Sequence, residues 1–568
     1  MRTHILTVVV EDYFHVAALR GAIRPKHWDR LDPRLDASLA IVLDLCDVHQ
    51  VKATFFVFGC VAEARPEVVQ RIVEHGHEVA SRGYAPRTLD GMTRADLVDD
   101  LSRARDALES AGSGRILGYR SPTWLRDRDL WVLDVLAEEG YAYDSSINPI
   151  LRRFASDPEK TRIHQHRHAD GTRSLWELPV ASFDLGGLRI PISGGNYVRQ
   201  IPHTLLKRLV DRKSSVDSDP LVFYFMLWEL DRDQPRVQGI SALNRLRHYR
   251  NLAKTRWVFE DYFTRYRFQG IADHLGLDKR QAPAPRAAAS TSAAAPADLR
   301  TVRDAAPAVP SAPVIPITLV IPIFNEQQNI GYLRRTLGNF RRRLGASYRV
   351  HFTLVDDAST DGTLALLQQS FRDVPDCAIV SHPQNRGVAA AMLTGIRAAP
   401  TEIVCTIDCD CSYDPHDLEA MIPLLDNADM VTASPYHPDG HVLNVPGWRL
   451  VLSKTLSRLY SIILKERIHT YTSCCRAFRK SRMADLTVEH GGFLGTAEML
   501  IELKLSGGRI VEHPATLEAR LFGESKMKIA RTIVGHLGLI RELGARRARH
   551  QAAASSSPKA NASPGAAA

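Results

Sequence analysis

A stretch rich in alanine and proline, residues 279–314, interrupts the chain near its middle and constrains the fold more than any other feature. It contains scattered Ser and Thr and shows no apolar periodicity, which predicts a disordered linker. Residues 547–568 have the same character and predict a disordered tail. We therefore expect two separately folded units, residues 1–278 and 315–546, each long enough to bury a full-sized core.

Cysteine usage, charge and hydropathy exclude several classes of protein. The eight cysteines form no evenly spaced framework, which favours a reduced, cytoplasmic setting. The chain enters a strand-like run at once, unlike a signal peptide, and no apolar run reaches the ~18 residues that span a bilayer. The net charge of +9 is modest, and much of its basic excess lies near the C-terminus, so we expect one basic face and no nucleic-acid partner.

An acid pair, Asp408 and Asp410, follows the short apolar run 403–407 and precedes a turn that contains Asp-Pro. A buried strand ending here would place both carboxylates on one face, at the edge where open α/β sheets bind ligands. Two close carboxylates repel each other, and a divalent cation relieves the repulsion. Oxygen ligands suit Mg²⁺ or Mn²⁺. The alternative is a solvated turn that happens to contain acids.

Strand-like and helix-like segments alternate ahead of the acid pair as three β-α units, which predicts a doubly wound nucleotide-binding sheet. In the loop 356–363, Asp357 and Asp361 can accept hydrogen bonds from a nucleoside, although Asp361 can equally cap the following helix. Gly387 lets the backbone approach a phosphate at a helix N-terminus, and a simple helix start explains it almost as well.

Six ordered motifs of this half resemble inverting family-two glycosyltransferases of the dolichyl-phosphate mannosyltransferase-like branch: residues 320–326, 355–363, 385–387, 408–410, 471–476 and 520–526. The resemblance implies one nucleotide-sugar-binding α/β domain with a mixed sheet. It also implies that a metal binds chiefly through Asp410, with Asp408 beside the diphosphate. The remaining implied contacts to the nucleotide sugar or to phosphate are Pro322, Asn325, Glu326, Asp357, Asp361, Gly387, Arg520, Ser525 and Lys526.

Departures from the family pattern leave the substrates open. The residues after the acid pair are Cys411, Ser412 and Tyr413, where many relatives have Leu-Gln-His. The donor is therefore GDP-mannose or a UDP-sugar, and the acceptor is a polyprenyl phosphate or a growing glycan. Glu498 can assist the reaction or form a salt bridge at the edge of the core. Residues 526–546 predict a basic amphipathic helix that either contacts a membrane peripherally, at the inner face of the cytoplasmic membrane, or packs on its own domain.

The N-terminal half alternates short strands and helices, which predicts parallel strands with crossover helices. Its motifs resemble the polysaccharide deacetylase family, in the branch found in exopolysaccharide gene clusters: residues 10–15, 53–57, 76–81, 118–122, 143–147, 194–197, 223–225 and 228–230. The resemblance implies a distorted (β/α) barrel, whose active members remove N-acetyl groups from sugar polymers with a metal-bound water.

The family's metal site does not carry over to this chain. Val9 stands where the family has the Asp base, and Arg82 and Pro86 replace the two His ligands. Met226 stands in place of the late His. Only Asp12 of the metal ligands and Arg120 of the supporting residues remain, so we expect a degenerate site without hydrolysis.

Nearby histidines offer no clear replacement. His75, His77 and the alternating set His164, His166 and His168 are expected at the surface or at helix ends, because no acidic partner is placed to complete a site. We therefore expect a glycosyltransferase of exopolysaccharide or glycolipid assembly. The alternatives are a bifunctional glycosyltransferase and deacetylase, and a non-catalytic carbohydrate-binding scaffold.

Overall fold

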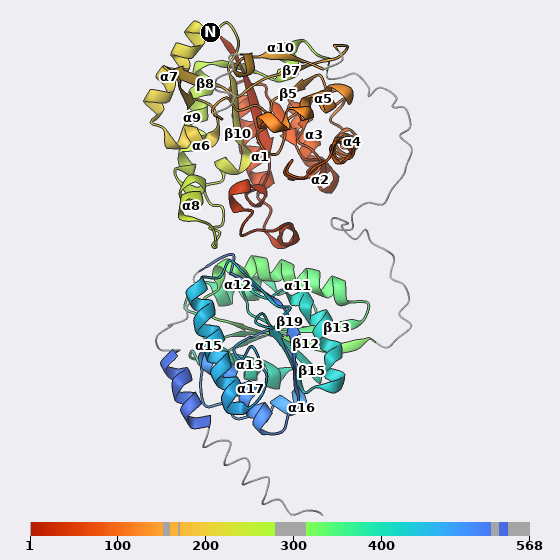
Figure 1. The fold of residues 1–568 in the computed structure, drawn as a ribbon, viewed down its shortest axis with the longest axis vertical. Coiled ribbons are helices and arrows are strands. Elements are labelled where there is room, and N and C mark those ends of the chain that lie inside the picture. Colours follow the sequence, from red (N-terminus) through yellow and green to blue (C-terminus); the bar gives the residue numbers. More distant parts are fainter. Residues whose placement is uncertain (1, 152–158, 169–170, 279–313, 524–532, 544–568) are drawn as a thin grey trace, which may run out of the picture. The chain divides into compact units, whose positions relative to one another are not determined.

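The computed structural model describes residues 2–151, 159–168, 171–278, 314–523 and 533–543 (Figure 1). The chain forms two compact units. The first consists of Met1–Arg20, Pro33–Gln234 and Ile240–Ala295, and the second of Gly21–Asp32, Pro235–Gly239 and Pro296–Ala568. The predicted linker lies outside the described residues except for Val314, and the predicted tail lies wholly outside them.

The first unit is built on one curled sheet of nine strands. Their bounds are β1 Thr3–Val10, β2 Thr54–Val57, β3 Glu78–Ser81, β4 Gly118–Tyr119, β5 Tyr143–Asp144, β6 His164–Arg167, β7 Ser174–Glu177, β10 Val222–Met226 and β11 Arg267–Gln269. The order is β10-β1-β2-β3-β4-β5-β7-β6, with β11 also paired to β1, and only the β6–β7 pair is antiparallel. This curled parallel sheet confirms the predicted distorted barrel.

Helices cross between the strands of this sheet, and a hairpin lies outside it. The helices are α1 Leu35–Val48, α2 Gly59–Ala64, α3 Pro66–Glu74, α4 Arg94–Ser110, α5 Trp131–Glu138, α6 Gly195–Gln200, α7 His203–Val216, α8 Ala242–Tyr249, α9 Leu252–Arg265 and α10 Ile271–Leu275. The hairpin pairs β8 Ser182–Leu185 with β9 Leu188–Pro191. Thr93 caps α4 by accepting from the N–H of Asp96, as its position before the helix predicts.

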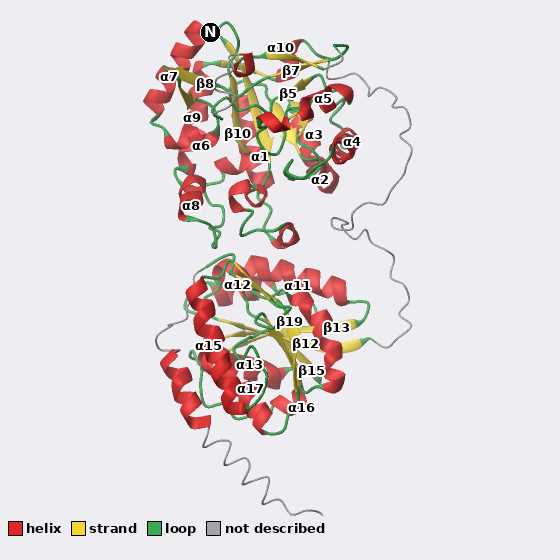
Figure 2. Cartoon of the chain, viewed as in Figure 1, coloured by secondary structure: helices red, strands yellow, loops and turns green. Residues whose placement is uncertain are grey.

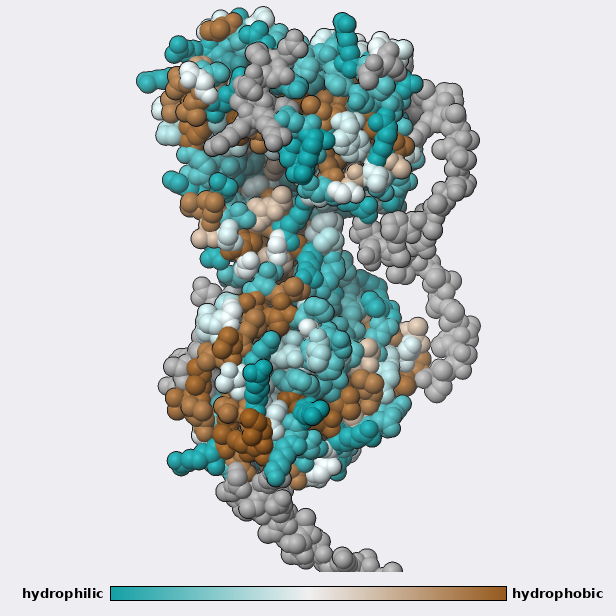
Figure 3. Space-filling view, viewed as in Figure 1, coloured by the Kyte–Doolittle hydropathy of each residue, from teal (hydrophilic) through white to brown (hydrophobic). Residues whose placement is uncertain are grey.

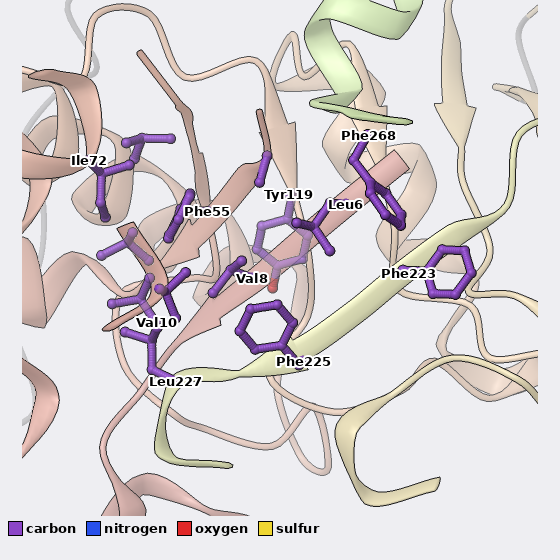
Figure 4. Packing of buried hydrophobic residues seen from close by; sticks show 14 of the residues in the cluster. Leu6, Val8, Val10, Phe55, Ile72, Tyr119, Phe223, Phe225, Leu227 and Phe268 are labelled. Carbon is purple, nitrogen blue, oxygen red and sulfur yellow. The ribbon is translucent and has the colours of Figure 1, made fainter. Parts of the chain in front are cut away.

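Strand β1 is buried on both faces, because helices cover the sheet. Leu6, Val8 and Val10 point into the larger apolar core, where Phe225 of the neighbouring strand also lies (Figure 4). Ile5 belongs to a separate cluster on the opposite face. This explains why the strand is continuously apolar rather than alternating.

The second unit has a mixed sheet of seven strands (Figure 2). The strands are β12 Ile315–Ile323, β13 Tyr348–Asp356, β14 Cys377–Ser381, β15 Ile403–Thr406, β16 Met430–Ser434, β18 Arg476–Arg479 and β19 Ile510–Pro514. A two-stranded ribbon pairs β17 His441–Leu443 with β20 Thr516–Glu518. The helices are α11 Ile330–Leu344, α12 Thr363–Ser370, α13 Val388–Ala398, α14 Leu418–Met421, α15 Gly447–Leu464, α16 Lys480–Met483 and α17 Gly492–Leu505, followed by a helix over residues 533–543.

The sheet of the second unit separates two apolar cores. Leu319 of β12 lies in the core that α11 and α12 cover, whereas Val320 lies in the core with α13 and α17. The order is β14-β13-β12-β15-β18-β16-β19, with β18 antiparallel to both neighbours, so the predicted doubly wound mixed sheet is confirmed. The strand order reverses between β12 and β15, which is where such sheets bind ligands.

The described part of the predicted C-terminal helix packs on its own unit. Leu539 and Leu543 are buried in the core beside α13 and α17, as the packing alternative requires. Ile533, Val534 and Leu537 remain exposed. No helix among the described residues has the length and apolarity to cross a membrane.

Candidate active site

Three side chains from distant parts of the chain meet beside the C-terminal ends of β12 and β15. Arg520, which follows β20, lies 2.7 Å from Oδ2 of Asp410 and 3.3 Å from Oε1 of Glu326. Glu326 follows β12, and Asp410 follows β15. The cluster therefore lies at the switch point of the sheet, as predicted for the ligand crevice.

The acid pair lies in a turn rather than in a strand. Strand β15 ends at Thr406, where its pairing with β18 ends, and the N–H of Cys411 donates to the carbonyl of Asp408. The prediction that both carboxylates extend from one face of a strand is therefore wrong. Ser412 donates to Oδ1 of Asp410 through its N–H (3.0 Å) and its hydroxyl (2.7 Å), which fixes the orientation of that carboxylate.

Electrostatic repulsion is built into this site. Burial, reinforced by the charge of Asp410, raises the pKa of Asp408 to about 7. Burial also raises the pKa of Glu326, and the nearby charge of Arg520 opposes that shift. A divalent cation on the acid pair would offset the repulsion, and carboxylate oxygens are ligands that Mg²⁺ and Mn²⁺ prefer.

The number of acidic ligands limits the kind of metal site that fits. In the described ranges, no three His, Cys, Asp or Glu side chains are grouped to hold a metal ion. Asp408 and Asp410 alone therefore fit an ion such as Mg²⁺, which typically binds one or two carboxylates and completes its shell with substrate phosphates and water.

Asp357 anchors a neighbouring loop. Its Oδ1 accepts from the N–H of Arg386 (2.8 Å) and lies 2.7 Å from Nδ1 of His382, while its Oδ2 accepts from the N–H of Gly387 (2.7 Å). Both carboxylate oxygens thus bond within the protein. The predicted role of Asp357 as a direct nucleoside contact stays a prediction, beside this positioning role that the spacing alone did not indicate.

Hydrogen bonds tie together the loops that follow β12 and β13. The N–H of Asn325 donates to the hydroxyl of Ser359 (2.9 Å), and the N–H of Thr360 donates to the Asn325 side chain (2.7 Å). Asp361 accepts from the N–H of Thr363 at the start of α12 (2.9 Å), which is the helix-start role left open by the sequence. These bonds give the rim of the crevice a defined shape.

Pro322 and Gly387 stand where the backbone decides the residue. Pro322 lies beyond Val320, the last residue of β12 that pairs with β15, so its missing N–H leaves no ladder bond unmade on that side. Gly387 has a φ of +89°, and a Cβ there would lie 2.4 Å from the backbone nitrogen of Gly492. Close packing at the start of α17 therefore requires this glycine.

Two polar residues of the site were not predicted. Asn329 is buried, and its amide donates to Oε2 of Glu326 (2.5 Å). Asp356 ends β13 with its Oδ1 buried and without a hydrogen-bond partner in the described part of the chain. In the sequence, Asn329 reads as a helix start and Asp356 as a turn beside Asp357, so neither carried a separate signal.

Three further predicted residues have different outcomes. Ser525 and Lys526, both predicted to engage phosphate, lie outside the described residues. Glu498 is fully buried and accepts from the N–H of His490 (2.9 Å), whose Nδ1 lies 3.0 Å from the same oxygen. This contact matches the salt-bridge alternative for Glu498.

In the first unit, the remaining acid of the degenerate site supports the backbone. Oδ1 of Asp12 accepts from the N–H of Tyr13 (2.8 Å), and Oδ2 accepts from the N–H of Arg34 (2.7 Å). Arg82 is buried 3.6 Å from Glu11. Burial lowers the pKa of Arg82 and raises that of Glu11, and each group's charge partly opposes the other's shift. A guanidinium therefore supplies positive charge in this part of the unit.

The other predicted positions of the degenerate site are also structural. Arg120 is fully buried and donates to the carbonyl and the hydroxyl of Ser145, each at 2.7 Å. Val9 and Met226 are register partners on β1 and β10. Pro86 lies in the loop between β3 and α4.

The alternating histidines have acidic partners, contrary to the expectation. Nε2 of His166 lies 2.9 Å from Asp134, and Nε2 of His168 lies 2.8 Å from Glu138. Both acids belong to α5, which the sequence could not place beside β6. Because each histidine meets a different carboxylate, these contacts are separate pairs rather than one metal site.

The mixed sheet and the acid–arginine cluster at its switch point define the second unit as a nucleotide-sugar glycosyltransferase domain. Residues 318–486 match the family model described as Glycosyl transferase family 2. The chain belongs to this family. Residues 32–143 match the Polysaccharide deacetylase family, and residues 145–275 match a domain of unknown function, DUF3473. The predicted resemblance of both halves is confirmed.

Three relatives match the second unit. Polyprenol monophosphomannose synthase of Mycolicibacterium smegmatis is 32% identical over 213 residues, 36% of this chain and 78% of the relative. Undecaprenyl-phosphate mannosyltransferase of Micrococcus luteus is 30% identical over 198 residues, 34% of this chain and 80% of the relative. Dodecaprenyl-phosphate galacturonate synthase of Rhizobium johnstonii is 29% identical over 219 residues, 37% and 61% respectively.

Solved structures also resemble each half. A Mycobacterium smegmatis protein described as a polysaccharide deacetylase matches with 20% identity and a TM-score of 0.32, over 50% of this chain and 96% of its own. Glucosyl-3-phosphoglycerate synthase of Mycobacterium tuberculosis, in complex with Mn²⁺, UDP and glucosyl-3-phosphoglycerate, matches with 16% identity and a TM-score of 0.31, over 41% and 79%.

Proposed function

We propose that the second unit transfers a sugar from a nucleoside-diphosphate donor to the phosphate of a polyprenyl phosphate. The observation that carries the proposal is the placement of Arg520 against Asp410 and Glu326 at the switch point of the sheet. The names of the three relatives support the acceptor class, since each contains a polyprenyl phosphate or polyprenol. Their names also differ in the sugar, mannose or galacturonate, so the donor stays open between GDP-mannose and a UDP-sugar.

The chemistry follows from charge. Asp410 with Asp408 would hold Mg²⁺ or Mn²⁺, which when bound supplies positive charge that stabilises the departing nucleoside diphosphate. The forked guanidinium of Arg520 suits phosphate oxygens. Ser412 orients Asp410, and Asn329 orients Glu326, so both carboxylates are held before substrate arrives. The acceptor phosphate is already ionised at neutral pH, so the transfer needs no strong general base.

A donor screen tests this proposal. The purified full-length chain is incubated with polyprenyl phosphate and with GDP-mannose, UDP-glucose or UDP-N-acetylglucosamine, and the lipid-linked sugar is measured. We expect product from one donor class, loss of product with EDTA, and recovery with Mg²⁺ or Mn²⁺. Product that persists in EDTA would contradict the metal, and transfer only to a glycan primer would contradict the acceptor.

We infer that the first unit, proposed as residues 1–278, no longer hydrolyses N-acetyl groups. The support is that Asp12 spends both oxygens on backbone N–H groups, and that the buried Arg82 brings positive charge where a ligand histidine is missing. A cation binds poorly beside a buried guanidinium. The second unit is proposed as residues 315–546, and the enzyme as cytoplasmic with peripheral contact at the inner face of the cytoplasmic membrane.

Metal content distinguishes this inference from a bifunctional enzyme. We expect the full-length chain, purified without chelator and dialysed against zinc, to retain far less than one zinc per chain, because the deacetylase ligand set is missing. Elemental analysis measures the ratio, and an Asp12→Asn variant serves as the control. About one zinc per chain that disappears in Asp12→Asn would restore the bifunctional alternative.

A further inference from the structure

Helix α15 of the glycosyltransferase unit exposes an apolar stripe. The helix buries Ser457, Tyr460 and Leu464 on one face. Its opposite face carries five large apolar side chains that are 37–72% exposed: Trp448, Val451, Leu452, Leu459 and Ile462. Their spacing places them along one side of the helix. Figure 3 shows hydrophobic side chains gathered along this side of the unit.

A basic cavity of about 440 Å³ adjoins the C-terminal half of α15. Beside Tyr436, five basic side chains line it: Lys454, Arg458, Lys465, Arg467 and His469. His469 lies 2.6 Å from Glu512, and the one acid that lines the cavity, Glu466, is paired with Lys504 at 2.8 Å. The other four cations have no carboxylate partner among the residues that the structure describes.

The helix over residues 533–543 adds to the same surface. The hydroxyl of Tyr460 lies 2.9 Å from Nδ1 of His536, so this helix packs beside α15. It exposes Ile533, Val534 and Leu537. Two neighbouring helices of the unit therefore leave apolar side chains uncovered, next to a cavity with unpaired positive charge.

We propose that α15 lies in the surface of an anionic phospholipid membrane and that the adjoining cavity binds the phosphate of a lipid headgroup. Interfacial helices combine an apolar face with Lys or Arg, and Trp favours the boundary between lipid and water. Residues 447–464 contain Trp448 and several cations but no Asp or Glu. Four cations without carboxylate partners complement an anionic headgroup. The contact is with bulk lipid, so the inference does not depend on the proposed transfer reaction.

Vesicle binding by the full-length chain tests this proposal, without donor or acceptor present. We expect binding to phosphatidylcholine vesicles that contain phosphatidylglycerol, much weaker binding to phosphatidylcholine alone, and weakening with salt. Each cation near such a surface contributes about fivefold, so Arg458→Gln with Arg467→Gln should weaken binding about 25-fold, and the Glu pair more. Val451→Asp with Ile462→Asp should abolish binding by removing the apolar contact.

Matched controls in the same unit are Arg372→Glu and Leu424→Asp. Arg372 is exposed on the loop after α12, and Leu424 is 38% exposed, and neither lines the cavity. All substitutions are at accessible positions, and thermal unfolding checks that each variant folds. Nucleotide binding, measured separately, should be equal in the cavity variants and the controls, so a failed donor site is distinguishable from a failed membrane surface.

Three outcomes would overturn the proposal. One is vesicle binding by the Arg458 and Arg467 variants that equals that of the controls. Another is saturable binding of inorganic phosphate that the cavity variants lose while vesicle binding persists, which would assign the cavity to free phosphate. The last is a dimer, seen by light scattering, that dissociates in the Val451 and Ile462 variant, which would make the stripe a contact between copies.

Discussion

Asp410→Asn is expected to lower sugar transfer about 10³-fold or more, because it removes a charge at the point where the diphosphate departs. The side chain is 8% exposed, and Oδ2 lies 2.7 Å from Arg520. Asparagine keeps the shape and can still accept from Ser412, so the loss reports charge rather than folding. The measurement is turnover in the donor screen, with the free energy of unfolding measured in parallel.

Asp426→Asn is the matched control for this substitution. Asp426 is an exposed acid of the same unit, in the segment before β16, and we expect its variant to retain activity. An Asp410→Asn enzyme with unchanged turnover would refute the site. A variant that loses both turnover and stability would show that Asp410 serves the fold, since Arg520 would then be the group left without its partner.

Arg199→Met is expected to destabilise the first unit by about 3–5 kcal/mol, the usual effect of leaving a buried charge without its partner. Nη2 of Arg199 lies 3.0 Å from Oε1 of Glu229, and the two side chains are 0% and 2% exposed. Nη1 also donates to the carbonyls of His248 (2.8 Å) and Arg250 (2.9 Å). The pair joins α6 to the segment that follows β10, which carries the Trp228-Glu229 motif.

Urea unfolding of the full-length chain measures this effect. Arg232→Met is the control, because Arg232 is 72% exposed and its pair with Asp233 should contribute less than about 1 kcal/mol. Adding Glu229→Gln to Arg199→Met should recover part of the loss by removing the orphaned carboxylate. A loss below about 1 kcal/mol in Arg199→Met would contradict the role of this pair.

Much of the second unit was predictable because its signals are local. A β-branched run followed by a polar turn indicates a strand end, and parallel strands bring such ends to one edge of a sheet. This reasoning placed Glu326 and Asp410 near each other correctly. It failed at Asp408 and Asp410 in detail, because strand length depends on where the pairing with β18 stops, at Thr406.

The sequence by itself determined the two units, the class of each sheet and the acidic turn, because composition and periodicity act over short stretches of chain. Only the tertiary structure decided which distant side chains meet. Arg520 reaches Glu326 across 194 residues because β20 ends beside the switch point. His166 and His168 likewise found acids on α5, and Asp357 turned inward to hold the Gly387 loop. Such contacts depend on strand order and register, which pairing between distant segments sets and no local pattern encodes.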